Sequence, residues 1–172
     1  NLFEKLKSGH AYVVFAESLT AGLISAEFSK IPGSSSVLWG GFVVYSPEAK
    51  EKLLGVSKSL IEKCGVVSEE CVLAMAEGAL KVSFTETQSF TGYSLAVPPS
   101  PFDEADVGTV YIAVAKTLNT GTEVCFDGNA EKSNQIEFCS EAKLFHFVGD
   151  RNAVREQTVN NGVKMLLDMV VG

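Results

Sequence analysis

The 172 residues are enough for one domain with a sizeable hydrophobic core and short for two, so the sequence predicts a single domain over residues 1–172. Acidic residues outnumber basic ones by 21 to 14, which gives a formal net charge of -7. This balance provides no broad electrostatic footprint for nucleic acid or an anionic membrane, and the chain contains no run of about 18 apolar residues that would span a bilayer. The expected partners are therefore a small molecule and further copies of this chain.

The cysteines and histidines are too few and too scattered to predict a metal site. The four cysteines, at positions 64, 71, 125 and 139, have no Cys-x-x-Cys spacing and no histidine within four residues. Zinc sites and thioredoxin-type pairs need such spacings. The even count leaves disulfides open, whereas the chain length favours reduced, buried thiols in a cytoplasmic protein. We expect neither a metal nor another cofactor.

The first third of the chain alternates strand and helix patterns. Residues 11–16 form a short apolar run that predicts a strand buried on both faces. A helix is predicted to begin at Ser18 or Thr20, either of which could cap it, and to end before Pro32. A polar serine loop at 34–36 and a second strand over residues 37–45 follow.

Three helices and a series of strands are predicted in the remainder. Serine caps predict helices from Ser46 to Gly55, from Ser57 to Gly65, and from Ser68 to about residue 82. Strands are predicted at 88–91, 107–116, 122–126 and 143–148, with a turn at 119–121 that would pair two of them antiparallel, and a last helix from residue 150. The pattern predicts an α/β fold, a three-layer α/β/α sandwich around a mainly parallel mixed sheet.

Two strand-to-helix turns could carry chemistry, because ligands of α/β sheets gather beyond the carboxyl ends of the strands. Ser18 follows the first strand, where it could act as a nucleophile or only cap a helix. A serine nucleophile needs a base, and His10 and His146 are poorly placed for that role. Lys50, near Tyr45 in the second turn, is the alternative, because partial burial lowers the pKa of an amine. The alternative from the sequence is that Tyr45 is an aromatic packing residue and Lys50 a solvated charge.

A third turn carries two arginines at the start of the last helix. Arg151 and Arg155 follow Gly149-Asp150, where guanidinium groups beside free helix N–H groups suit a phosphate or carboxylate. They could equally form salt bridges with neighbouring acids.

An ordered set of motifs then points to a family. It comprises Ala16-Glu17-Ser18-x-Thr20-x-Gly22, Pro32-Gly33-Ser34-Ser35, Gly40-Gly41-Phe42-Val43-Val44-Tyr45-Ser46, Ala49-Lys50, Val107-Gly108-Thr109-Val110-Tyr111-Ile112-Ala113 and Gly149-Asp150-Arg151. In this order and spacing the set resembles the CinA C-terminal domain family over nearly the whole chain.

The resemblance implies a nicotinamide-nucleotide amidohydrolase, which converts nicotinamide mononucleotide and water to nicotinic acid mononucleotide and ammonia. It implies Ser18 as the nucleophile, Lys50 as its base, and Tyr45 as a residue that orients the lysine or bonds the serine. The resemblance also implies a cytoplasmic homodimer or higher homo-oligomer. The substrate-binding residues implied with it are Thr20, Ser34, Thr91, Gly92, Arg151 and Arg155.

Three departures from the family pattern bear on this interpretation. Leu19 stands where the family usually has cysteine and Ala21 where it usually has glycine, and both are small local changes. Residues 93–101, with three prolines, stand where the family has a glycine-rich loop lining the site. A second interpretation is therefore a CinA-like nucleotide-binding or interaction domain with weak or no amidohydrolase activity.

Overall fold

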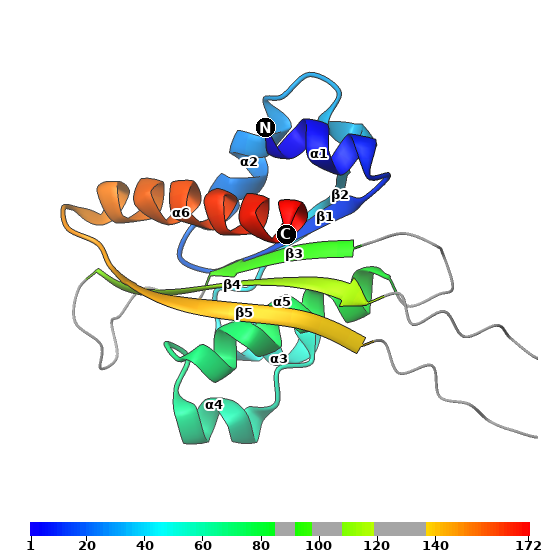
Figure 1. The fold of residues 1–172 in the computed structure, drawn as a ribbon. Coiled ribbons are helices and arrows are strands. Elements are labelled where there is room, and N and C mark those ends of the chain that lie inside the picture. The colour runs from blue at the N-terminus through cyan, green and yellow to red at the C-terminus, as the bar shows by residue number, and fades with distance from the viewer. Residues whose placement is uncertain (85–91, 98–107, 119–136) are drawn as a thin grey trace, which may run out of the picture.

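The computed structural model describes residues 1–84, 92–97, 108–118 and 137–172 and contains a five-stranded sheet with helices on both faces (Figure 1). The mixed α/β class is confirmed. The helices are α1 (Leu2–Ser8), α2 (Leu23–Ser29), α3 (Pro47–Leu54), α4 (Lys58–Cys64), α5 (Glu69–Ser83) and α6 (Arg151–Val171), with a 3₁₀ turn, η1 (Ser34–Ser36). The strands are β1 (Tyr12–Glu17), β2 (Leu38–Val43), β3 (Gly92–Val97), β4 (Thr109–Leu118) and β5 (Glu137–His146). None of the described helices is long and apolar enough to cross a membrane.

The strand order is β2-β1-β3-β4-β5. β1 runs parallel to β2 and β3, whereas β3–β4 and β4–β5 are antiparallel, so parallel pairs do not predominate in the described sheet. Strands β1, β2, β3 and β5 therefore end at the same edge of the sheet, which we name the C-terminal edge. The loops that follow these strands meet there.

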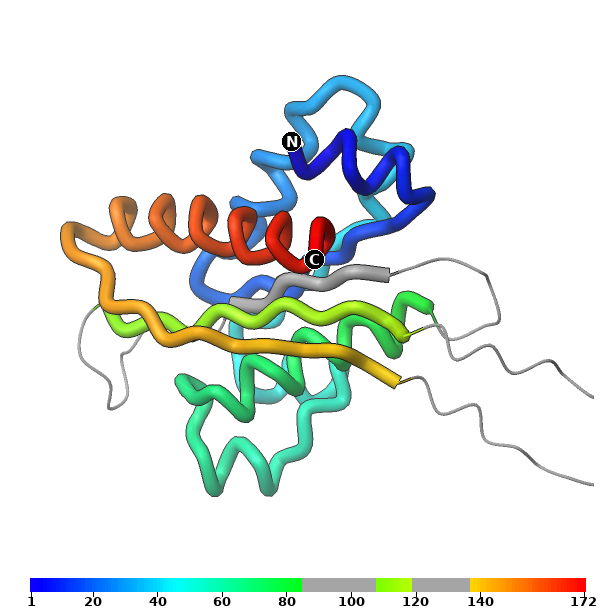
Figure 2. The backbone as a smooth tube through the Cα atoms, in the orientation of Figure 1, coloured from blue at the N-terminus to red at the C-terminus, as the bar shows by residue number. Residues whose placement is uncertain are grey.

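Two hydrophobic clusters lie on opposite faces of the sheet. One is covered by α1, α2 and α6, and the other by α3, α4 and α5 (Figure 1). Strand β1 supplies Phe15 to the first cluster and Val14 to the second, because successive strand side chains point to opposite faces. The uninterrupted apolar run of this strand follows from that double burial. Both chain ends lie on the α6 side (Figure 2).

The predicted starts of α3 to α6 are confirmed at their caps. The side chains of Ser46, Ser57, Ser68 and Asp150 each accept a hydrogen bond from the backbone N–H three residues on, at 2.9–3.2 Å. Each bond satisfies one of the free donors at its helix start.

Close packing fixes α3 against α5. A Cβ atom added at Gly78 of α5 would lie 2.1 Å from the carbonyl oxygen of Leu54 in α3. Only glycine allows this approach of the two backbones. The contact determines how α3, which carries Lys50, lies over the sheet.

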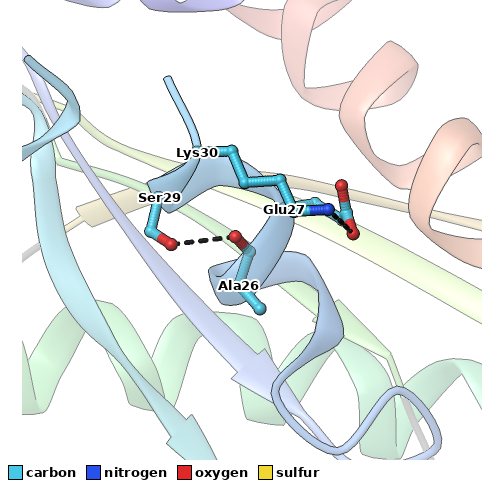
Figure 3. A network of polar contacts seen from close by, with 4 residues as sticks. All are labelled: Ala26, Glu27, Ser29 and Lys30. Atoms are coloured by element: carbon cyan, nitrogen blue, oxygen red, sulfur yellow. Dashed lines mark hydrogen bonds and ion pairs between the residues drawn. The ribbon is translucent and has the colours of Figure 1, made fainter. Parts of the chain in front are cut away.

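Several predictions differ from the structure. Helix α1 was not predicted, and α2 begins at Leu23, with Gly22 rather than Ser18 or Thr20 at its N-cap position. At the other end of α2 the hydroxyl of Ser29 donates to the carbonyl oxygen of Ala26 (Figure 3). The serines at 34–36 form η1 rather than an open loop.

The second half of the chain also differs. The segment predicted as an altered loop at 93–101 begins with β3, which continues to Val97. β5 begins at Glu137, before the strand predicted at 143–148, and ends at His146. The predicted strands at 88–91 and 122–126 and the turn at 119–121 lie outside the described residues.

Candidate active site

The turn that follows β1 lies at the C-terminal edge and carries Ser18. The side chains of Ser18 and Thr20 are fully buried. The turn then passes through Ala21 at φ 51° and Gly22 at φ 93°, both in the left-handed region. That conformation costs an alanine about 1–2 kcal/mol. The alanine at position 21 is therefore not the small change that its size suggested.

Glu17, the last residue of β1, binds the start of α2. Its carboxylate accepts hydrogen bonds from the backbone N–H of Ile24 at 3.0 Å and of Ser25 at 2.9 Å, and from the Ser25 hydroxyl at 2.6 Å. The side chain is fully buried. A carboxylate at a helix N-terminus is stabilised by the free N–H groups and by the helix dipole. Glu17 thus does what Ser18 or Thr20 was predicted to do.

Lys50 reaches the same turn from α3. Its Nζ atom donates to Oγ of Ser18 at 3.2 Å, to the carbonyl oxygen of Val44 at 2.7 Å and to that of Tyr45 at 3.3 Å. The Ser46 cap and Pro47 begin α3 directly after β2, and this start brings residue 50 over the end of β1. The amine is fully buried.

Burial changes the acid–base behaviour of this amine. Loss of hydration lowers the pKa of Lys50 from 10.5 to about 8, while nearby Cys71 opposes the shift. At pH 7 about a tenth of such an amine is neutral. Burial also raises the pKa of the Cys71 thiol to about 11, so this thiol stays protonated near neutral pH. Lys50 can accept the proton of the adjacent serine hydroxyl.

Tyr45 contributes to the site mainly through its backbone. Its carbonyl oxygen contacts both Lys50 and Ser18, the latter at 3.5 Å from Oγ. Its hydroxyl instead lies 2.6 Å from Nη2 of Arg151, which donates to it. The phenol therefore connects the end of β2 to the first turn of α6.

Arg155 connects α6 to the Ser18 turn. Its Nη2 donates to the carbonyl oxygen of Thr20 at 2.9 Å. Nε of Arg155 and Oγ1 of Thr20 are both buried and have no hydrogen-bond partner among the described residues. Unpaired buried polar atoms are costly. Each of these atoms would be satisfied by a water molecule or another polar group placed beside it.

The structure brings most of the predicted site residues together, at the C-terminal edge: Ser18, Thr20, Tyr45, Lys50, Arg151 and Arg155. Ser34 precedes β2 and Gly92 begins β3, so both lie at the opposite edge of the sheet. Thr91 lies outside the described residues. Within the described ranges, no group of three or more His, Cys, Asp or Glu side chains could hold a metal ion.

Two residues of the site were not predicted. An acidic residue at the end of an otherwise apolar buried strand was the available signal for Glu17, because a buried carboxylate requires donors. Cys71 has no comparable signal, since a buried cysteine in a helix looks like any small apolar residue.

The family model described as the CinA C-terminal domain matches residues 1–144. A CinA-like protein of Fervidobacterium nodosum is 50% identical over 123 residues, which cover 70% of this chain and 30% of that protein. A CinA-like protein of Thermosipho melanesiensis is 40% identical over 167 residues, which cover 96% of this chain and 36% of that protein. The chain thus spans about a third of the length of these curated relatives.

Solved structures share the fold. A CinA superfamily protein from Klebsiella pneumoniae has a TM-score of 0.76 at 22% identity, covering 99% of this chain and 93% of that one. The competence/damage inducible protein CihA of Agrobacterium tumefaciens has a TM-score of 0.71 at 26% identity, covering 98% of this chain and 93% of that one.

The lowered pKa of Lys50 predicts a pH-dependent difference in stability between the wild type and Lys50→Met. The folded chain loses the lysine proton near pH 8 and the unfolded chain near 10.5, so the unfolded state binds more protons between these values. The wild type should therefore gain about 3 kcal/mol of unfolding free energy relative to Lys50→Met between pH 7 and 10.5. Urea unfolding across this range measures the difference.

The exposed Lys52 on the same helix provides the matched control, since its amine pairs with Glu48 at the surface. Lys52→Met should keep a nearly constant difference from the wild type across the same pH range. A constant difference for Lys50→Met as well would contradict the lowered pKa.

Proposed function

Because the chain belongs to the CinA C-terminal domain family, we propose that it is a nicotinamide-nucleotide amidohydrolase, which converts nicotinamide mononucleotide and water to nicotinic acid mononucleotide and ammonia. The observation that carries the proposal is the 3.2 Å contact between the buried amine of Lys50 and Oγ of Ser18. A nucleophile within hydrogen-bond reach of its base is the arrangement required for covalent catalysis of acyl transfer.

In the first half of the proposed reaction, Oγ of Ser18 attacks the carboxamide carbon while neutral Lys50 takes the hydroxyl proton. The negative charge then develops on the carboxamide oxygen. The backbone N–H groups of Leu19 and Thr20 make no hydrogen bond within the described part of the chain and are available to this oxygen. The first-turn N–H groups of Ile24 and Ser25 are not, because Glu17 occupies them.

Collapse of this intermediate breaks the carbon–nitrogen bond, and Lys50 passes its proton to the leaving ammonia. The product is an ester between Ser18 and the nicotinoyl group. In the second half, a water molecule attacks the ester carbon while Lys50 accepts a water proton. The ester bond breaks, the proton returns to Oγ of Ser18, and the carboxylic acid product leaves.

The nucleotide is proposed to bind toward α6. Arg151 would hold its phosphate or ribose, and Nε of Arg155 with Oγ1 of Thr20 would hold another polar group of the substrate. Local guanidinium groups must attract this anion, because the chain as a whole carries a net charge of -7. Ser34 and Gly92 are not part of this proposal, since they lie at the opposite edge.

The alternative, a nucleotide-binding or interaction domain with weak or no amidohydrolase activity, was suggested by residues 93–101. Five of these residues are part of β3, and the three prolines lie outside the described residues. No described residue therefore favours the alternative over the enzyme. We also propose that the protein is cytoplasmic and at least a dimer, and a monomer in light scattering would contradict the second statement.

Replacement of the nucleophile gives the first test. The wild type should release ammonia from nicotinamide mononucleotide, and Ser18→Ala should lower kcat by about 10³-fold or more, because only binding and oxyanion stabilisation are left. Ser29→Ala, an exposed serine on α2, is the control and should keep wild-type activity. Circular dichroism establishes that both variants are folded. An active Ser18→Ala protein would contradict the assignment.

The base gives a second test, through the pH dependence of the rate. Because Lys50 acts only when neutral, kcat/KM should rise about tenfold per pH unit up to pH 8 and level off above it. Lys50→Ala should lose most of the activity and recover part of it at high pH, where hydroxide replaces the missing base. A rate that is constant between pH 6 and 9 would exclude Lys50 as the base.

Tyr45→Phe separates the phenol from the backbone carbonyl. The substitution removes the hydrogen bond to Arg151 and leaves the carbonyl oxygen beside Lys50 in place. KM should rise about tenfold through the loss of one charge-assisted bond at the nucleotide site, with kcat nearly unchanged. A large fall in kcat at constant KM would instead place the phenol in the chemical step.

A further inference from the structure

We propose that Glu17 is a positioning residue of the site, whose carboxylate holds the Ser18 turn in the conformation that presents Oγ of Ser18 to Lys50. The kinetic part of this inference rests on the proposed amidohydrolase function. The structural part does not, because it concerns the conformation of residues 18–22.

Three hydrogen bonds tie the Glu17 carboxylate to the far side of the turn. They come from Ile24 and Ser25, seven and eight residues along the chain, at distances of 2.6–3.0 Å. Both ends of the turn are therefore joined through one side chain. No cation pairs with this carboxylate among the described residues, so these donors and the dipole of α2 alone offset its burial.

The backbone of Glu17 is connected to the lysine side of the site. Its carbonyl oxygen accepts a hydrogen bond from the N–H of Val44 at 2.8 Å, and the carbonyl oxygen of Val44 in turn accepts from Lys50 at 2.7 Å. Glu17 is thus bound to α2 through its side chain and, through its main chain, to Val44, which accepts a hydrogen bond from Lys50. The next residue, Ser18, is the proposed nucleophile.

Successive residues of a strand point to opposite faces, which explains why Glu17 and Ser18 contact different helices. Phe15 belongs to the cluster under α2 and α6, and Glu17 continues on that face, where it meets α2. Ser18 turns the other way, toward Lys50 of α3. Fixing the Glu17 side chain therefore limits rotation of the peptide that leads to Ser18.

Backbone strain in the turn makes such a restraint necessary. Ala21 is held at φ 51°, a conformation that persists only where the surroundings determine it. The Glu17 bonds close the loop that contains this residue. Without them, Ala21 could relax to negative φ and carry Ser18 away from Lys50.

The space around the Ser25 hydroxyl, the third donor to Glu17, supports the positioning role of Glu17. A Cβ atom at Gly41 of β2 would lie 2.6 Å from the Ser25 hydroxyl, which donates to Glu17. The absent side chain at position 41 leaves room for this hydroxyl. The glycine at position 41 of β2 thus has a packing reason.

Glu17→Gln tests the proposal with nearly the same side-chain shape. The amide oxygen of the glutamine can still accept, but its NH₂ group faces a backbone donor and leaves it unpaired. We expect kcat to fall about 10- to 100-fold with KM within about threefold, because a displacement of about 1 Å at the nucleophile costs this much. Hydrogen exchange at the amides of Ile24 and Ser25, measured by NMR, should become faster.

Glu27→Gln is the matched control on the same helix. Glu27 pairs with Lys30 at the surface, 2.7 Å from its amine (Figure 3). This variant should match the wild type in kcat and in exchange at Ile24 and Ser25. Wild-type kcat in folded Glu17→Gln would overturn the proposal, since the role would then be only structural.

A crystal structure of Glu17→Gln separates this inference from the proposed function. If the wild type releases no ammonia, the proposed function fails, and the separation of Oγ of Ser18 from Nζ of Lys50 decides the inference. A separation beyond about 4 Å supports positioning, because no hydrogen bond spans it, and the wild-type 3.2 Å overturns it. If Glu17→Gln does not fold, Ser25→Ala replaces it, and the distance from Oγ of Ser18 to Nζ of Lys50 is judged in the same way.

Discussion

The amine of Lys50 lies in the core of the molecule, where hydration is replaced by the serine hydroxyl and two backbone carbonyl oxygens. Burying an ammonium group is costly, and these acceptors offset only part of the cost, which is why the pKa falls. The remainder of the fold must hold the amine there. The cap at Ser46 sets the start of α3, and the missing side chain at Gly78 lets α5 hold α3 close.

The burial of Lys50 also explains why the adjacent residues Glu17 and Ser18 make different contacts. Ser18 must face Lys50 on the α3 side, so the cap of α2 has to come from the α2 side of the strand. Because side chains alternate along β1, the side chain of Glu17 lies on that side. A helix N-terminus that could have attracted an anionic ligand is thereby occupied by the protein itself.

The starts of most helices could be predicted from local sequence, because a helix cap is a hydrogen bond between residues only three positions apart. The starts of α3 to α6 followed from one serine or aspartate each. The proximity of Ser18 and Lys50 could be predicted as well, since both follow parallel strands. Strand direction places Ser34 and Gly92 away from Ser18, because the residues that open parallel strands lie at the edge opposite to those that close them.

The role of Tyr45 and the position of β3 could not be predicted in the same way. A side-chain pattern does not reveal that a carbonyl oxygen makes the contact, because every residue has one. The segment at 93–97 combines polar and apolar residues without clear alternation, and its strand pairing depends on β1 and β4, far away in sequence.

The three basic side chains at the C-terminal edge differ in what their surroundings allow. Arg151 and Arg155 present planar guanidinium groups, whose several N–H donors suit an anion. Burial lowers the pKa of Lys50 to about 8, so this amine can exchange a proton near neutral pH. One fully buried amine with a lowered pKa therefore lies close to two guanidinium groups of α6. Burial, rather than position in the sequence, sets the acid–base behaviour of Lys50.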